Sequence, residues 1–166
     1  SKADLSTQHR KSAFVLKLSV EKMAQKYGLE HLGFLTLTFA DDVQCHKQAQ
    51  KRFNSLKTHV LKVRYLDHVG VKERQKSGRL HYHLLVALKK DIRTNIDFEE
   101  FSLGNYKSAS KALRSEWTYW RDTSKKYKFG RTELLPIKSN TEAIAKYVGK
   151  YIAKHIENRN FNDKGA

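Results

Sequence analysis

Proline, cysteine and methionine each occur once in this chain of 166 residues, and no apolar run approaches the length of a membrane span. The single cysteine, Cys45, excludes a disulfide within the chain and is typical of a reducing compartment. It directly precedes His46, a spacing unlike that of a zinc ligand pair, so we interpret it as incidental. The N-terminus carries no secretory signal pattern.

Negative charge is also scarce, with 17 Asp and Glu against 33 Lys and Arg and a formal net charge of +16. This excess predicts a polyanionic partner, with nucleic acid as the first candidate and an anionic membrane surface as the second. The length indicates one domain over residues 1–166. Within it we expect an N-terminal helix in residues 1–30 and a flexible polar tail over 157–166, which frays or leads into a further domain.

The spacing of apolar residues predicts an α+β fold. We expect helices over 11–27, from Asp41 or Asp42 to 61, over 108–125 and over 139–155, strands over 34–39, 63–73, 79–88 and 131–137, and a loop over 91–106. Lys76-Ser77-Gly78 is a turn signal that joins two strands into a hairpin. Because strands and helices do not alternate strictly, we expect an antiparallel or mixed sheet with helices packed against it.

Two histidines, His81 and His83, lie one residue apart in an apolar strand, so their side chains point to one face. Two imidazoles on one face can hold one divalent metal ion. Glu73 faces this strand across the hairpin turn and is the expected third ligand, with Gln75 and Asp67 as weaker alternatives. Such a set leaves positions open for water and phosphate oxygens, as a catalytic ion requires. The alternative is that the histidines only form hydrogen bonds.

Two tyrosines, Tyr147 and Tyr151, are four residues apart in a predicted helix and therefore share one face. A phenol is a poor nucleophile at neutral pH because its pKa is about 10, but nearby cations lower that pKa. Lysines recur every four residues along the same helix, at Lys146, Lys150 and Lys154. Lys150 is expected to assist the phenolate or to neutralise phosphate in the transition state. The alternative is an ordinary amphipathic helix with tyrosines in the core and lysines in solvent.

These residues together resemble the HUH endonuclease superfamily. His81-Tyr82-His83 matches its His-hydrophobic-His strand, and Tyr147-x-x-Lys150-Tyr151 resembles the two-tyrosine motif of rolling-circle replication initiators from phages and plasmids. Thr36-Leu37-Thr38 resembles the threonine-containing strand beside the metal site in these proteins. The three motifs occur in the family's order, and the resemblance spans roughly residues 34–155.

The resemblance implies a central antiparallel sheet of about five strands flanked by helices, of the RNA-recognition-motif or palm type. It implies a divalent metal, Mg²⁺ in the cell and more tightly bound Mn²⁺ in the test tube, at His81, His83 and a polar residue. It further implies that Tyr147 and Tyr151 attack origin DNA, single-stranded or in a hairpin or cruciform. The products are a covalent 5′-phosphotyrosine and a free 3′-OH that primes replication.

A protein of this kind is expected in the cytoplasm of a bacterial or archaeal host, away from membranes, with a host or linked helicase as partner. The chain itself is expected to be the nuclease domain or a minimal protein, without helicase activity. A single-tyrosine transposase of the same superfamily and a non-catalytic nucleic-acid-binding domain stay open as alternatives. A plasmid-mobilising relaxase is disfavoured, because here the tyrosines follow the histidines.

Contacts with DNA phosphates are expected from basic residues near these motifs, which give affinity without reading sequence. The candidates are Arg79, Lys128, Arg131, Lys146 and Lys154. Two tryptophans, Trp117 and Trp120, are candidates for stacking on unpaired bases, with burial in the core as the alternative.

Overall fold

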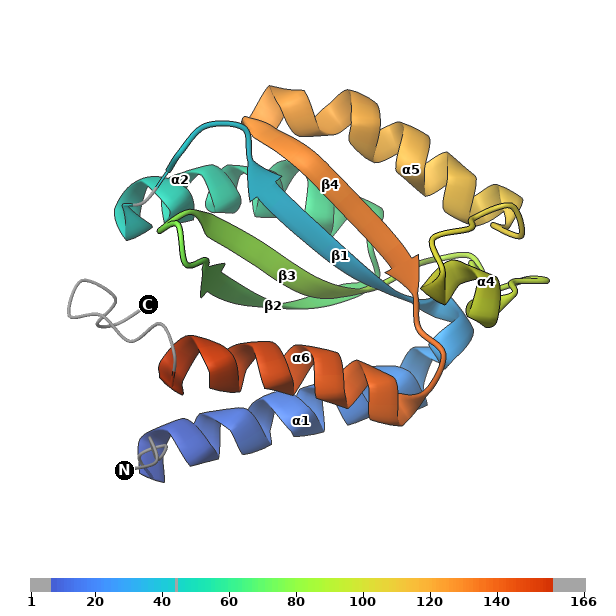
Figure 1. The fold of residues 1–166 in the computed structure, drawn as a ribbon, viewed down its shortest axis with the longest axis horizontal. Helices are drawn as coiled ribbons and strands as arrows, with labels where there is room; N and C mark the ends of the chain where they lie inside the picture. Colours follow the sequence, from blue (N-terminus) through green and yellow to red (C-terminus); the bar gives the residue numbers. More distant parts are fainter. Residues whose placement is uncertain (1–6, 44, 157–166) are drawn as a thin grey trace.

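The computed structural model describes residues 7–43 and 45–156, without the side chains of His9 and of residues 150–156. The elements follow in the order α1 (Thr7–Tyr27), η1 (Leu29–His31), β1 (Leu32–Phe39), α2 (His46–Leu56), η2 (Lys57–Leu61), α3 (Lys62–Arg64), β2 (Asp67–Arg74), β3 (Leu80–Ala87), α4 (Phe98–Ser102), α5 (Lys111–Thr123), η3 (Ser124–Tyr127), β4 (Phe129–Pro136) and α6 (Asn140–Ile156) (Figure 1). Within the described ranges, no helix combines the length and the hydropathy that a membrane span needs.

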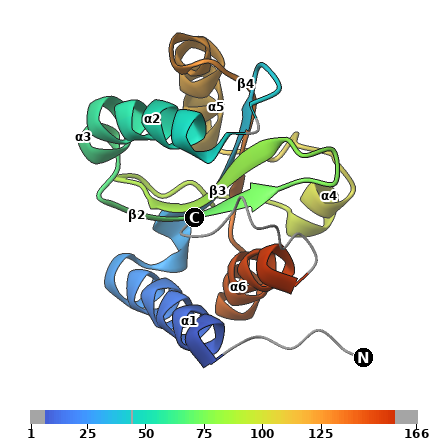
Figure 2. The ribbon, with the colours of Figure 1, turned by 90° about the vertical axis from the view of Figure 1, so that its left-hand side faces the viewer.

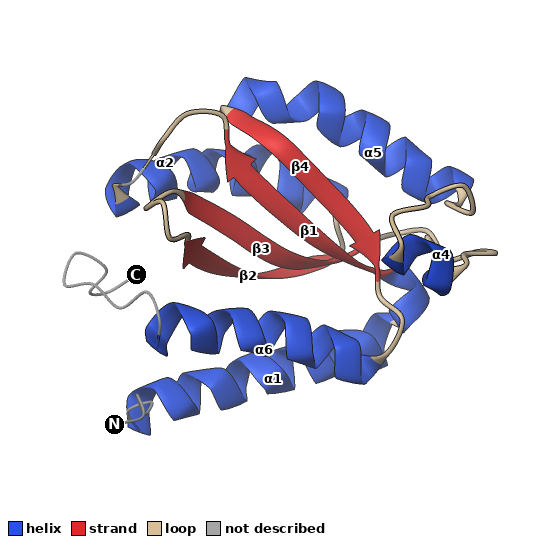
Figure 3. Ribbon diagram, in the orientation of Figure 1, coloured by secondary structure: helices blue, strands red, loops and turns tan. Residues whose placement is uncertain are grey.

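The strands form one antiparallel sheet in the order β2-β3-β1-β4, which confirms the expected α+β fold. Residues 7–43 and 45–156 contain four strands in this sheet, compared with the expected five or so. The hairpin of β2 and β3 forms at the predicted turn, where Gly78 has a φ of 90° that favours glycine. The outer strands are β2 and β4, so β4 has one edge without a strand neighbour (Figure 3).

Helices cover both faces of the sheet (Figures 1 and 2). Helices α1 and α6 contact each other across one face, and α2 and α5 cover the other. Alternate residues of β1 follow this division: Leu35 and Leu37 belong to the core on the α2 and α5 side, and Phe34 to the core on the α1 and α6 side. By the same alternation, Thr36 and Thr38 lie on the face that α1 and α6 cover.

Three predicted boundaries are wrong. The second strand begins at Asp67 rather than near residue 63, because buried Val60 and Leu61 extend the apolar side of α2 through η2 and α3. The segment expected as loop contains α4, whose first turn is capped by the Asp97 carboxylate accepting from Glu100 N–H at 3.1 Å. The fourth strand begins two residues earlier than expected, at Phe129.

Candidate nicking site

The two histidines of β3 lie side by side on the sheet face that carries α1 and α6. His81 and His83 are buried, with 6% and 5% of their surfaces exposed. Their rings are nearly parallel, at an interplanar angle of 3° and a centroid distance of 6.3 Å. The alternation of the strand therefore places both imidazoles on one face, as the sequence predicted.

Strand β1 holds both imidazole rings through its threonines. In the sheet register Thr36 is opposite His83 and Thr38 is opposite His81. The Oγ1 of Thr38 lies 3.0 Å from Nδ1 of His81, and the Oγ1 of Thr36 lies 3.3 Å from Nδ1 of His83. Because each Nδ1 faces a hydroxyl of β1, the Nε2 side of each ring is turned away from β1. Such a contact is what orients a histidine that binds a metal through its other nitrogen.

Glu73 of β2 lies on the same face, on the opposite side of β3 from the threonines. It is opposite His81 in the register, and its Oε1 lies 2.9 Å from Nε2 of His83. The structure thus brings together the three expected ligands, His81, His83 and Glu73. The alternative ligand Asp67 is paired with Ala87 at the far end of β2, about 20 Å along the strand from Glu73.

The chemistry of this donor set suits a divalent ion: two imidazoles oriented by hydroxyl groups, and one carboxylate next to the second imidazole. In the described part of the chain, however, no three His, Cys, Asp or Glu side chains are grouped closely enough to hold an ion as they stand. The Glu73 carboxylate is instead hydrogen-bonded to His83. To bind an ion, the Glu73 oxygen and Nε2 of His83 must exchange this mutual contact for the metal.

These side chains line a recess of about 490 Å³, which we call the histidine hollow. Its wall also includes Gln75, Arg79, Arg131 and Glu133. Glu133 lies on β4 opposite Thr36, so a second carboxylate borders the hollow on the side away from Glu73. Glu133 was not among the predicted site residues, because only the pairing of β4 with β1 brings it near the histidines. Its alternation with Arg131 along the strand was the available signal.

Tyr147 of α6 is fully buried against the histidine face of the sheet. Its ring meets Phe34 edge to face at 6.3 Å, and Phe34 in turn stacks on His83 at 5.9 Å. Burial raises the pKa of the Tyr147 phenol well above its ordinary value. Its hydroxyl has no hydrogen-bond partner in residues 7–43 and 45–156. For Tyr147, the core position that the amphipathic alternative predicted is the one observed.

The rest of the tyrosine motif follows on α6. Tyr151, Lys150 and Lys154 belong to this helix, but their side chains lie outside the described residues. Lys146 is described: its Nζ lies 5.6 Å from the centre of the Phe34 ring and 3.9 Å from a Glu142 oxygen. Lys146 is therefore held next to the aromatic pair that connects α6 with the histidines.

The other expected DNA contacts lie around the hollow or near it. Arg79 begins the strand that carries the histidines, and its Nε is 3.9 Å from Asp42. Lys128 is exposed in the turn before β4 with a φ of 62°, and Arg131 is exposed on β4. Trp120 is buried in the core, which confirms the alternative to base stacking for this residue. Trp117 is only partly buried.

Residues 33–156 match the model of a family of replication-associated proteins of the ORF2 type. The chain is also 56% identical over 162 residues to the "Phasyl DNA replicon protein arp" of Escherichia coli. This similarity covers 98% of the chain and 57% of the relative, so the chain spans little more than half of that protein's length. No solved structure matches the chain. The matched span contains both histidines, both threonines of β1 and the tyrosine helix, and the chain belongs to this family of replication-associated proteins.

Proposed function

We propose that this chain nicks and rejoins single-stranded DNA at a replication origin through a covalent tyrosine intermediate. The observation that carries the proposal is the histidine face of the sheet. It holds two imidazoles oriented by threonine hydroxyls, a carboxylate 2.9 Å from one of them, and the tyrosine helix packed across the same face. Membership in a family of replication-associated proteins supports the same function.

In this proposal His81, His83 and Glu73 hold a divalent cation, Mg²⁺ in the cell and Mn²⁺ more tightly in vitro. Such an ion, when bound, polarises a phosphate oxygen and offsets the charge that develops at phosphorus. Thr36 and Thr38 fix the imidazoles by their Nδ1 atoms. Arg79 and Arg131, on the wall of the hollow, neutralise the phosphates on either side of the one attacked.

The phenolate oxygen of a tyrosine attacks phosphorus, and the bond between phosphorus and the 3′ oxygen breaks. The phenol loses its proton before or during attack, and the departing 3′ oxygen gains one. The product is a 5′-phosphotyrosine and a free 3′-OH. Because the new ester conserves the energy of the broken linkage, the reverse attack by a 3′-OH rejoins the strand without another energy source. Lys150 is assigned to support the phenolate.

The burial of Tyr147 bears on which tyrosine attacks. A phenol with a raised pKa and no hydrogen-bond partner within the described residues is poorly prepared to lose a proton. Tyr151 follows Tyr147 by about 6 Å along the helix axis and shares its face. This favours Tyr151 as the first nucleophile. Tyr147 then serves in a second attack after α6 has shifted, or, as in a single-tyrosine enzyme, not at all.

The biological role that we propose is initiation at a replicon origin, in the cytoplasm of the host. This role takes its support from the family and from the replicon protein that the chain resembles. The origin DNA presents the cleaved strand unpaired, in a single strand or the loop of a hairpin or cruciform. A host or linked helicase then extends the opened region from the 3′-OH.

The deciding experiment incubates the protein with labelled single-stranded oligonucleotides from the replicon, with Mn²⁺ or with chelator. Denaturing gels and mass spectrometry then locate any adduct. We expect a 5′-phosphotyrosine adduct that chelator abolishes and that His81→Ala loses while DNA binding persists. In the two-tyrosine scheme, Tyr147→Phe and Tyr151→Phe each leave some cleavage, and the double substitution leaves none. Complete loss from Tyr151→Phe alone would assign a single-tyrosine reaction. Salt-sensitive binding without any adduct would contradict nicking and favour a binding domain.

A further inference from the structure

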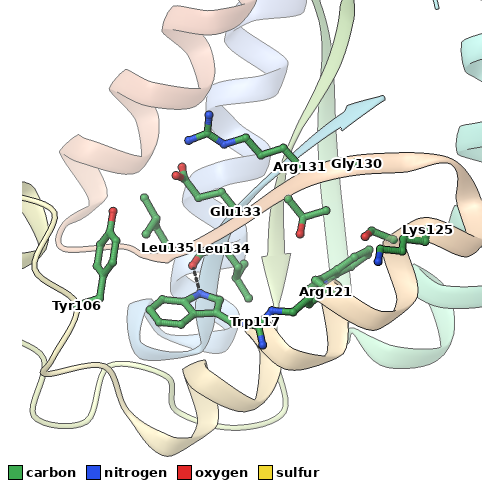
Figure 4. A pocket seen from close by; sticks show the side chains of 12 residues that line it. Tyr106, Trp117, Arg121, Lys125, Gly130, Arg131, Glu133, Leu134 and Leu135 are labelled. Carbon is green, nitrogen blue, oxygen red and sulfur yellow. Dashed lines mark hydrogen bonds between the residues drawn. The ribbon is translucent and has the colours of Figure 1, made fainter. Parts of the chain in front are cut away.

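A groove of about 460 Å³ follows the outer edge of β4, between this strand and α5 (Figure 4). Because β4 is the last strand of the sheet, this edge has no strand beside it. The volume falls within the range of about 300–1,000 Å³ that is usual for sites of small molecules. We call it the edge groove. The proposed nicking reaction makes no use of it.

One end of the edge groove is aromatic and held in place. The indole Nε1–H of Trp117 donates to the backbone carbonyl of Leu134 at 2.7 Å, which fixes the ring against β4. Tyr106 meets Trp117 edge to face at 5.7 Å and Phe101 at 4.9 Å, yet 39% of its surface stays exposed. Figure 4 shows these two rings next to each other at one end of the groove. A base that enters this end meets an oriented aromatic surface.

The remainder of the edge groove is basic. Arg121 and Lys125 line it from the α5 side and Arg131 from β4. In the part of the chain that the structure describes, none of these three cations is within ion-pair distance of a carboxylate. Elsewhere the protein neutralises its arginines, as in the pair of Arg52 with Asp41. Cations left without a counter-charge around a groove attract an anionic ligand.

The edge groove is continuous with the histidine hollow. Gly130, Arg131 and Glu133 line both, because β4 separates the two and Arg131 lies at the rim. A DNA strand whose phosphate is attacked in the hollow therefore reaches the edge groove by crossing a single strand of the sheet. The glycine makes this crossing low, since a side chain at Gly130 would crowd Ala40, whose Cα would be 3.2 Å from the added Cβ.

We propose that the edge groove holds one unpaired nucleotide of the DNA strand next to the nick. The base stacks on Tyr106 and Trp117, and the adjoining phosphate lies between Arg121 and Lys125. The inference rests on the proposed function for the direction in which the DNA runs, but not for the existence of the groove. It adds a determinant of strand position, since seating one nucleotide here sets which phosphate reaches the histidines.

A peptide that adds a strand to β4 is the competing occupant, and the edge suits it less well. The indole of Trp117 already occupies the carbonyl of Leu134. Pro136 has no N–H to donate at the end of the strand. A partner strand would therefore find an interrupted row of hydrogen-bonding groups, along a groove with three cations.

The phosphate half is tested by fluorescence anisotropy with a labelled single-stranded oligonucleotide, in chelator, over a series of salt concentrations. Each phosphate contact contributes about 0.7 to the slope of log affinity against log salt for single strands. For Arg121→Gln/Lys125→Gln we therefore expect a slope smaller by about 1.4. The matched control is Lys89→Gln/Lys90→Gln, which removes two exposed charges after the far end of β3 and should keep the parental slope.

The base half is tested at Tyr106, whose ring is partly exposed. Tyr106→Ala should weaken binding roughly 5- to 150-fold, the range expected for loss of one stacked base, while Tyr106→Phe should bind normally. An oligonucleotide with one abasic position, moved along the strand, locates the seated nucleotide. At that position the wild type and Tyr106→Ala should bind equally well, because the stacking partner is gone from both. Circular dichroism and thermal unfolding confirm that each variant folds.

Parental affinity and salt slope in both edge-groove variants would overturn the proposal and leave the edge to a peptide. An effect of Tyr106→Ala that persists unchanged at every abasic position would overturn the base contact, because it would indicate an indirect structural effect. These results are distinguishable from failure of the nicking reaction. If the variants lose binding and the wild type forms no adduct, the edge groove stands without the nuclease. If adducts form equally with all variants, the nuclease stands without the edge groove.

Discussion

At the scale of single residues, the most informative side chain is Tyr147. A tyrosine from a predicted nucleophile pair is fully buried, with no hydrogen-bond partner for its hydroxyl in the described part of the chain. Such a hydroxyl is a cost to folding, because it leaves water and gains no partner. The ring contributes apolar contacts to the core, and the hydroxyl contributes none of the stability. Its presence is better explained by chemistry than by packing.

This leads to a prediction for Tyr147→Phe. We expect the variant to unfold at the same denaturant concentration as the parent or to gain about 1 kcal/mol, since an unpaired buried hydroxyl costs about 1–3 kcal/mol. Urea unfolding followed by circular dichroism measures this change. A loss of more than about 1 kcal/mol would mean that the hydroxyl has a partner in solution. With stability intact, any change in strand transfer by the variant reports on chemistry alone.

At the scale of elements, β1 acts as the positioning strand of the site. It is paired on both edges, and its threonines face the Nδ1 atoms of both histidines. A strand held between β3 and β4 can orient side chains more firmly than a loop. The tyrosine helix is supported from the other side by α1, which packs beside it on the same face. The site is thus built between a central strand and a pair of helices.

The role of β1 predicts the effect of Thr38→Val. Valine keeps the shape and the strand preference of threonine but removes the hydroxyl 3.0 Å from Nδ1 of His81. We expect Mn²⁺ affinity, measured by calorimetry, to fall about 10- to 100-fold, as for other partners that orient a metal-binding histidine. Thr132→Val, on the neighbouring strand β4, is the control and should bind Mn²⁺ normally. Unchanged affinity in Thr38→Val would exclude this orienting role.

At the scale of the whole molecule, one sheet separates two apolar cores while the surface carries a net charge of +16. Each core contains a tyrosine that burial keeps neutral. Burial and the nearby Glu116 raise the pKa of Tyr65 on the α2 and α5 side, and burial raises that of Tyr147 on the other. Because both phenols ionise more readily in the unfolded chain, high pH favours unfolding.

We therefore predict a loss of stability above about pH 10, the ordinary pKa of tyrosine. Below that pH both states keep these protons and the contribution is complete. Above it the unfolded state binds fewer protons than the folded state, so the free energy of unfolding decreases as pH rises. Each phenol contributes up to about 1.4 kcal/mol per pH unit. Urea titrations at several alkaline pH values measure the slope, and Tyr147→Phe should reduce it by one phenol's share. An identical slope in this variant would contradict the prediction.

The sequence by itself determined the local geometry of the site. The two-residue period of a strand puts His81 and His83 on one face, and the turn at Gly78 brings Glu73 next to them, whatever surrounds the hairpin. The α+β class followed from the apolar patterns in the same way. These inferences succeeded because they depend on backbone periods and on a short turn, which neighbouring residues decide.

Only the tertiary structure decided which distant residues complete the site. The pairing of Thr38 with His81, the approach of Glu133 and the place of Tyr147 in a core depend on the register of β1 against β3 and β4 and on the packing of α6. The edge groove exists because β4 is the last strand in the order. Register, strand order and layer packing are set by contacts between segments far apart in the chain, and no local pattern encodes these contacts.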